Sequence, residues 1–102
     1  MANFIENEDH KSPEDFYVSL KEKLEVNHNF PEDYPFKFII INEEKKITEI
    51  YRVFDDMKFT LTTRDSKNAK YTSLSITAFV LDAEQVIEIY KKVGEIEGVM
   101  SL

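Results

Sequence analysis

Apolar and polar residues alternate in two stretches of the second half of the chain. The alternation covers residues 57–62 and again 71–80, and a period of two is typical of half-buried strands. Residues 65–70 between them are predicted to form the turn of a hairpin. An earlier segment, FKFIII at 36–41, ends in three isoleucines, so both of its faces are apolar. This pattern favours a central strand.

Three helices are predicted from apolar residues that recur at helical spacing. Two stripes at i, i+3, i+4, i+7 predict buried helix faces. They consist of Ile47, Ile50, Tyr51 and Phe54, and of Val86, Ile89, Tyr90 and Val93. Asn42 is expected to cap the first of these helices, and Asp82 with Gln85 to cap the second.

The third helix is predicted near the start of the chain. Phe16, Leu20 and Leu24 recur every four residues, which indicates an amphipathic helix over 12–26. The segment 27–35 contains two prolines and ends this helix. Residues 1–33 are therefore expected to comprise a flexible N-terminus and an amphipathic helix.

The predicted order is a helix followed by β-α-β-β-α-β, with a short last strand over 96–102. Two β-α-β units joined by a hairpin are typical of the ferredoxin-like fold. Residues 34–102 are thus predicted to be a ferredoxin-like domain of the α+β class. The prediction is a two-layer sandwich with an antiparallel sheet in the order 4-1-3-2.

Composition and charge narrow the classes of function. The chain has 102 residues, no cysteine and a net charge of −7. The absence of cysteine excludes disulfides and thiol catalysis and fits a reducing cytoplasm, and no apolar stretch is long enough for a membrane helix. Residues 1–33 hold 9 acidic and 3 basic residues. Neither half has the basic surplus that binding to a nucleic-acid backbone requires.

The last third of the sequence resembles the YbeD-like family (domain of unknown function 493). The resemblance rests on Ser66-Lys67, on YTSLSIT at 71–77 and on EQV at 84–86, followed by Ile89-Tyr90, Val93-Gly94 and Ile96. It extends over about residues 30–102, and FPEDYPFK at 30–37 resembles the family's entry into its first strand. The resemblance implies a ferredoxin-like fold similar to ACT regulatory domains and implies no activity. Asn42 stands where the family tends to have glycine.

No catalytic constellation is found, and the chain is interpreted as non-enzymatic and free of cofactors. His10 and His28 lack a second ligand at helical metal-site spacing, so no metal site is predicted. Asp55 and Asp56 are adjacent and are interpreted as a turn. RNA binding by this fold needs aromatic rings on the central strands, where this chain has small hydroxyl residues instead.

A basic cluster surrounds the predicted hairpin. Arg64, Lys67 and Lys70 lie in or beside it, and the topology places Asn42 and the start of a helix at the same end of the sheet. Cations beside a helix N-terminus can hold a carboxylate or phosphate. These four residues form the candidate ligand site of the alternative hypothesis, a sensor of an anionic metabolite.

The second candidate site is the sheet face that points away from the two helices of the β-α-β units. Its predicted residues are Lys37, Ile39, Ile41, Ser73, Ser75, Thr77 and Phe79. Short side chains and an apolar strip suit the packing of a flat partner. The N-terminal helix 12–26 is the favoured occupant, and a second subunit in a homodimer is the alternative. The leading hypothesis is an ACT-like regulatory or protein-interaction domain whose partner is not identified.

Overall fold

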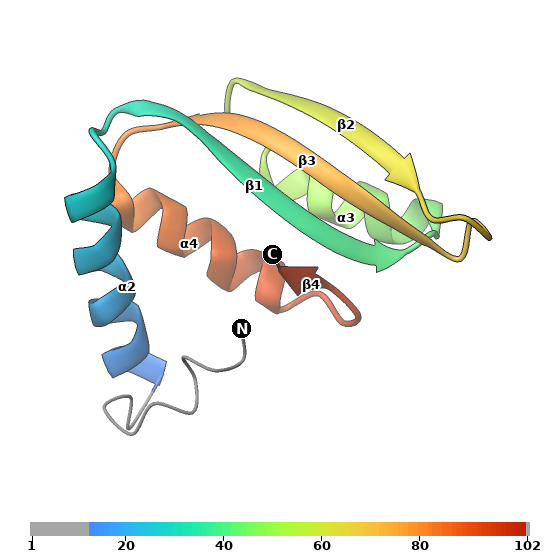
Figure 1. Cartoon of the computed structure of the whole chain (residues 1–102), viewed down its shortest axis with the longest axis horizontal. Coiled ribbons are helices and arrows are strands. Elements are labelled where there is room, and N and C mark those ends of the chain that lie inside the picture. Colours follow the sequence, from blue (N-terminus) through green and yellow to red (C-terminus); the bar gives the residue numbers. More distant parts are fainter. Residues whose placement is uncertain (1–12, 102) are drawn as a thin grey trace.

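The computed structural model describes residues 13–101 and contains a four-stranded antiparallel sheet (Figure 1). The strands are ordered β2-β3-β1-β4. This order is the predicted 4-1-3-2 read from the other edge, so the ferredoxin-like α+β fold is confirmed. The elements are α2 (Pro13–Asn27), β1 (Glu32–Ile41), α3 (Glu44–Val53), β2 (Phe59–Asp65), β3 (Tyr71–Val80), α4 (Ala83–Gly94) and β4 (Met100–Ser101).

The two central strands pair along their full length. β1 and β3 run antiparallel from Glu32 opposite Val80 to Ile41 opposite Tyr71. β1 therefore begins four residues before the apolar run at Phe36 that predicted it, because β3 is long enough to pair with the polar residues ahead of that run. The last strand is shorter than expected, since Gly98 takes a positive φ of 85° in the turn before it.

The core lies between the sheet and the two helices α3 and α4. Alternate residues of β1 and β3 are buried against these helices, as the alternation predicted. The rings of Phe36 and Phe54 meet edge to face at 5.3 Å, and Phe36 meets Tyr90 in the same way at 5.4 Å. The fully buried large side chains are Phe36, Phe38, Phe54, Ile40, Ile50, Leu74, Ile76, Val80, Val86, Val93 and Thr72.

Three members of the predicted helix stripes are not fully buried: Ile47 and Tyr90 are half-buried, and Tyr51 is exposed. Tyr51 of α3 is 49% exposed, whereas Ile50 and Phe54 are fully buried. A four-residue stripe spans a wide arc of the helix, and Tyr51 lies on its flank. Its ring extends toward the edge strand β2 and contacts Phe59 edge to face at 5.1 Å. The expectation of burial is therefore wrong for Tyr51.

The two predicted helix caps have different outcomes. Asp82 caps α4 as expected, since its Oδ1 accepts a hydrogen bond from the Gln85 backbone N–H at 2.9 Å. Asn42 does not cap α3, whose N-cap residue is Glu43 and has no side-chain capping bond. The Asn42 side chain instead donates from Nδ2 to the Ala69 carbonyl at 3.0 Å. The Asn42 amide therefore bonds to the hairpin and not to the first turn of α3. The local sequence could not show this, because the partner Ala69 is distant along the chain.

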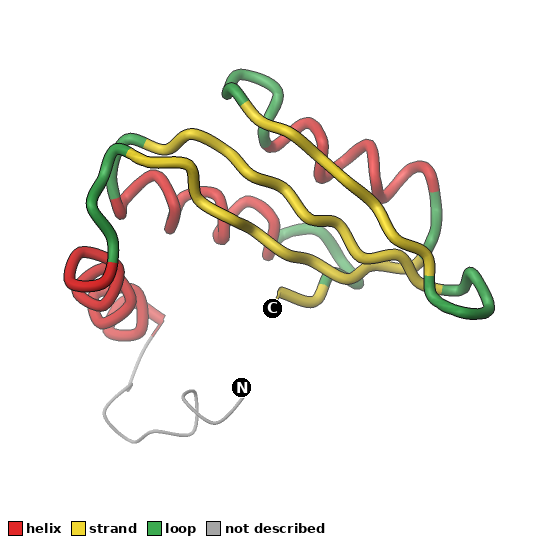
Figure 2. Tube along the Cα trace, turned by 45° about the horizontal axis from the view of Figure 1, so that its top comes forward, coloured by secondary structure: helices red, strands yellow, loops and turns green. Residues whose placement is uncertain are grey.

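The N-terminal helix packs against α4 and not on the free face of the sheet, so the expected docking is wrong (Figure 2). Leu24 is 5% exposed and belongs to the core cluster. Lys21 Nζ donates to Glu84 Oε1 at 2.9 Å, and Lys91 Nζ lies 4.7 Å from the centre of the Tyr17 ring. The hydrogen bond and the charge of Glu84 raise the pKa of Lys21.

The orientation of β3 predicts a sharp contrast between neighbouring residues. Leu74→Ala removes a fully buried side chain and should lower the free energy of unfolding by about 2–5 kcal/mol. Ser75→Ala on the other face should change it by less than about 0.5 kcal/mol. Urea denaturation measures both. Equal effects of the two substitutions would show that the strand faces are assigned wrongly.

The packing of α2 on α4 predicts a second contrast within one helix. Leu24→Ala should cost about 2–4 kcal/mol because it leaves a cavity in the core. Val26→Ala, two residues further on, removes a side chain that is 83% exposed and should be nearly neutral. Thermal and urea unfolding of the full chain test this. A neutral Leu24→Ala would mean that α2 is not anchored in the core.

Candidate functional site

The sheet has one face that no helix covers within residues 13–101, and we call it the open face (Figure 2). The strand registers arrange its side chains in rows across the sheet. One row crosses all four strands, from Arg64 through Ser73 and Ile39 to Met100. The residues of the open face are Asp33, Pro35, Lys37, Ile39, Ile41, Thr60, Thr62, Arg64, Tyr71, Ser73, Ser75, Thr77, Phe79 and Met100.

The seven residues predicted for this face all lie on it. In β3, Ser73 is half-buried and Ser75, Thr77 and Phe79 are exposed, whereas the residues between them are buried. Asp33, Pro35, Tyr71 and Met100 were missed, the first two because β1 begins earlier than its apolar run. Tyr71 has the same parity as Ser73 and could have been included, but Met100 could be placed only from the pairing of β4 with Ile39.

The open face combines apolar side chains with cations. Ile41, Tyr71, Phe79 and Met100 are exposed by 42, 41, 43 and 60%. The central strand β3 contributes only short side chains between residues 73 and 77, so the middle of the face is flat. Lys37 and Arg64 are exposed on either side of it, and neither takes part in an ion pair among the described residues. Such a surface suits a flat partner with apolar and acidic groups.

The hairpin between β2 and β3 is held by its own polar groups. Asn68 Oδ1 accepts bonds from Ser66 Oγ and from the Lys70 backbone N–H, each at 3.1 Å. Ala69 takes the left-handed conformation with φ 60°, a role that the sequence analysis did not foresee for alanine. The side chain of Asn68 thus links both sides of the turn.

The predicted anion site at this end is only partly assembled. Asn42 is joined to the hairpin through its backbone N–H, which donates to the Lys70 carbonyl at 2.9 Å, and through its side chain. Arg64, Lys67 and Lys70 are exposed, and Lys70 Nζ lies 5.6 Å from the centre of the Tyr71 ring. The topology thus brings the four residues to one end of the sheet, but the Asn42 backbone N–H and one of its two side-chain N–H groups already bond to the hairpin.

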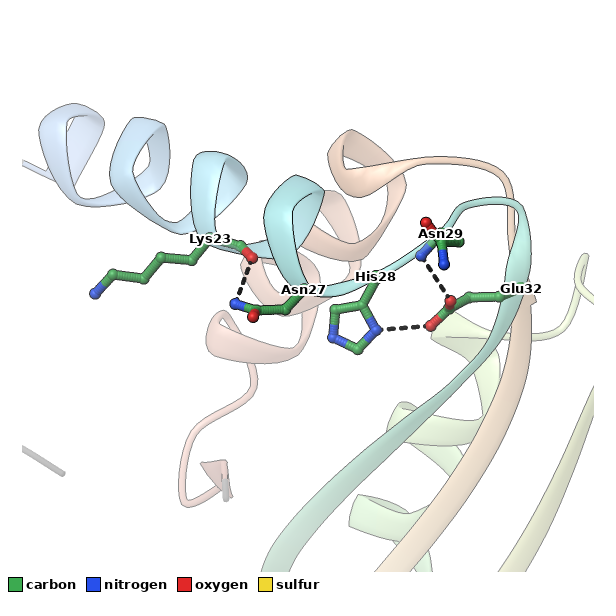
Figure 3. A network of polar contacts seen from close by, with 5 residues as sticks. All are labelled: Lys23, Asn27, His28, Asn29 and Glu32. Carbon is green, nitrogen blue, oxygen red and sulfur yellow. Dashed lines mark hydrogen bonds and ion pairs between the residues drawn. The ribbon is translucent and has the colours of Figure 1, made fainter.

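A polar corner connects α2 to β1 and directs the helix away from the open face (Figure 3). Both oxygens of Glu32 are engaged. Oε2 lies 2.7 Å from His28 Nδ1, and Oε1 accepts a bond from the Asn29 backbone N–H at 3.1 Å. His28 is half-buried between the rings of Phe30 and Tyr34. His28 therefore contributes to the fold, and His10 lies outside the described residues.

Tyr90 is the buried titratable group next to this corner. Burial, and then a hydrogen bond with Tyr34, raise the pKa of Tyr90 far above its usual range. The phenol therefore stays protonated through the physiological range, and it serves the packing of the aromatic core. Its neighbours are the rings of Phe36 and Phe38, which offer nothing for proton transfer.

A shallow groove of about 500 Å³ lies at the C-terminal ends of α3 and α4. Arg52 and Lys92 line it together with four carboxylates, and Val53 and Ile96 add apolar surface. Asp55 and Asp56 are in the turn after α3, as expected, and both border this groove. Since acids and bases alternate along an open surface, the groove resembles a solvated rim more than an enclosed ligand site.

Metal and membrane sites are not found in the part of the chain that the structure describes. No group of three or more histidine, aspartate or glutamate side chains is positioned to hold a metal ion among residues 13–101. None of the described helices is both long and apolar enough to cross a membrane.

Comparisons with known proteins extend this picture. The family model described as "Protein of unknown function (DUF493)" matches residues 25–102. None of the curated proteins matches the chain. The solution structure of protein HP0495 from H. pylori is similar, with a TM-score of 0.62 at 21% identity over 92% of this chain and 91% of that protein.

Two further structures share the fold. The uncharacterized protein TM1266 from Thermotoga maritima has a TM-score of 0.56 at 12% identity, over 70% of this chain and 91% of that one. The ACT domain from GTP pyrophosphokinase of Chlorobium tepidum has a TM-score of 0.53 at 14% identity, over 70% of this chain and 100% of the domain. Similarity at these identities shows a common fold.

The raised pKa of Tyr90 predicts how stability depends on alkaline pH. An unfolded tyrosine loses its proton near pH 10, whereas folded Tyr90 holds it to higher pH. Above that point the unfolded state binds fewer protons, so stability falls as pH rises. Tyr90→Phe should flatten this loss, and Tyr51→Phe, which removes an exposed phenol, is the matched control. Urea midpoints measured from pH 8 to alkaline pH decide it; identical slopes for wild type and Tyr90→Phe would contradict the assignment.

Proposed function

The chain belongs to the DUF493 family of proteins of unknown function, the YbeD-like family, and on that premise we propose that it is a cytoplasmic, non-enzymatic interaction module with an ACT-like regulatory role. Its binding surface is the open face of the sheet. The observation that carries this proposal is that α2 packs on α4 and leaves an apolar, cationic face exposed.

The open face exposes several large apolar side chains next to one another. Ile39, Ile41, Tyr71 and Met100 adjoin each other near the hairpin end, because the registers place Ile41 opposite Tyr71 and Ile39 opposite Met100. Contiguous apolar surface with a polar rim is typical of sites of protein interaction. Burying these side chains against a partner would provide most of the affinity.

The charge of the open face selects the kind of partner. The whole chain carries a net charge of −7, yet this face carries the two cations Lys37 and Arg64 against one carboxylate, Asp33, with Lys67 and Lys70 in the adjoining hairpin. A partner segment that is acidic and apolar would therefore be complementary. The flat row of Ser73, Ser75 and Thr77 allows a helix or strand of that partner to approach closely.

The hypothesis of an anionic-metabolite sensor at the hairpin end has less support. Arg64, Lys67 and Lys70 remain available there, but one of the two N–H groups of the Asn42 side-chain amide is committed to the Ala69 carbonyl. The groove between the ends of α3 and α4 lies at the other end of α3. The role of Arg64, Lys67, Lys70 and Asn42 in binding a ligand stays a prediction.

Site-specific photo-crosslinking in the native cell tests the interaction surface. A photoreactive residue at Ser75, in the middle of the open face, should yield one discrete adduct with a partner protein. The same residue at Glu88, exposed on α4, is the matched control and should yield none. Replacing Lys37 and Arg64 by glutamate should lower the Ser75 adduct about tenfold, which corresponds to about 1.4 kcal/mol of binding energy.

A second charge variant separates the face from net charge. Lys23→Glu with Lys45→Glu changes the net charge by the same amount at exposed positions of α2 and α3, so it should leave the adduct unchanged. Equal adducts from Ser75 and Glu88, or none from Ser75, would contradict the proposal.

A further inference from the structure

Within residues 13–101, the edge strand β2 presents a backbone edge that no other strand pairs with. β2 is the outermost strand of the sheet and has β3 as its one neighbour in the order β2-β3-β1-β4. Its residues Phe59–Thr63 contain no charge and no proline, and three of these five are threonine. Natural edge strands are usually protected by lysine, proline, a bulge or very short length. The middle of β2 has none of these devices.

The hydrogen bonds to β3 show which backbone groups of β2 point outward. Lys58 accepts from the Phe79 N–H at 3.0 Å, and the Ser66 N–H donates to the Tyr71 carbonyl at 2.8 Å. Because such bonds alternate along an antiparallel ladder, the even-numbered residues of β2 face β3. The odd-numbered ones therefore direct their N–H and C=O groups out of the sheet. These residues are Phe59, Leu61, Thr63 and Asp65.

The opposite edge of the sheet is protected, which makes the exposure of β2 specific. β4 pairs with Phe38 and Ile39 of β1. In the part of β1 that β4 does not cover, Pro35 has no backbone N–H to offer. An added strand would therefore find a continuous ladder at β2 and an interrupted one at β1.

Apolar side chains beside β2 continue this edge into the helix layer. Tyr51 is 49% exposed and contacts Phe59 at 5.1 Å between ring centroids. Phe59 and Leu61 are themselves only half-buried. An aromatic and aliphatic strip thus runs along the edge on the helix side, where a second protein layer could cover it.

We propose that two copies of this chain pair through β2 about a two-fold axis at Thr62, and this pairing stands independently of the proposed function. In this register Leu61 lies opposite Thr63 of the second copy and Thr60 opposite its Arg64. Asp65 lies opposite Phe59 at the ends of the pairing, where its exposed carboxylate can turn to solvent.

The neighbouring registers are less favourable. A one-residue shift that centres the axis on Leu61 places Lys58 opposite Arg64 of the second copy, and like charges in directly opposite positions are destabilising. Centring the axis on Thr63 places the Leu61 side chain opposite the Asp65 carboxylate of the second copy, close to the centre of the pairing. The Thr62 register avoids both arrangements and forms hydrogen bonds at all the outward-pointing residues.

This pairing would join two sheets into one of eight strands. The Tyr51 side chains would become less exposed to solvent, because the two α3 helices would approach each other on the helix side of the joined strands. The two open faces would become continuous, which would double the length of the surface. Self-pairing is closed by its two-fold axis, so no free β2 edge would remain for aggregation.

Sedimentation equilibrium of the full chain, together with single-cysteine variants, tests the pairing. The wild type should dimerise at micromolar to millimolar concentrations. Thr63→Pro removes an outward-pointing N–H and leaves the ladder to β3 intact, so it should weaken dimerisation at least about tenfold. Thr63→Val keeps the N–H and should dimerise like the wild type. Thr63→Lys places a charge at the edge and gives the same test should the proline variant not fold.

The chain has no native cysteine, so an engineered one reports on the contact directly. Thr62→Cys should form an intermolecular disulfide under mild oxidation, because the axis sets this residue opposite its own copy. Thr77→Cys, exposed on the open face, is the control and should form little. A wild type that stays monomeric at millimolar concentration would overturn the proposal. So would Thr63→Lys dimerising like the wild type, or Thr77→Cys cross-linking as efficiently as Thr62→Cys.

Discussion

The burial of Leu24 beneath the helix layer is the contact on which the arrangement of the molecule depends. It inserts the last turn of α2 into the core and holds that helix against α4. The Glu32 corner fixes the chain direction at the same point, since its carboxylate holds both His28 and the Asn29 backbone. With α2 held there, its apolar stripe is satisfied and cannot also cover the sheet.

The open face is a consequence of this packing, whereas the β2 edge follows from the strand order. A four-stranded sheet with both crossover helices on one side has one bare face. In this chain α2 could have covered that face. It packs instead against α4, which already covers the other face. What remains exposed is an apolar and cationic surface on a chain whose net charge is −7. The fold thus separates a core that stabilises the protein from a surface available for recognition.

The fold could be predicted from sequence because its signals are periodic and local. The alternation over 71–80 assigned both faces of β3 correctly, and the Asp82 cap followed from a short motif. The position of α2 could not be predicted, because an amphipathic stripe shows that a helix is buried but not which surface buries it. The same limit explains Tyr51 and Asn42. Tyr51 turns toward Phe59, and Asn42 bonds to Ala69, a residue 27 positions away.

The candidate site was predictable as a face but not as a complete surface. Residue parity within β1 and β3 placed its seven predicted residues, whereas Met100 joins them only through the pairing of β4 with β1. The predicted ligand cluster shows the converse. Topology brings Arg64, Lys67 and Lys70 to one end of the sheet. The bond of the Asn42 side chain to the Ala69 carbonyl depends on the conformation of the turn, in which Ala69 is left-handed.

The central claim is that α2 lies on α4 and leaves the open face free, and a nuclear Overhauser spectrum of the full chain tests it most directly. The structure predicts cross-peaks between the Tyr17 ring and the Lys91 side chain, which lie 4.7 Å apart from Nζ to ring centre. It predicts none from Tyr17 or Leu24 to Ile39, Ile41 or Phe79. Cross-peaks from α2 to those three residues would place the helix on the sheet and contradict the account.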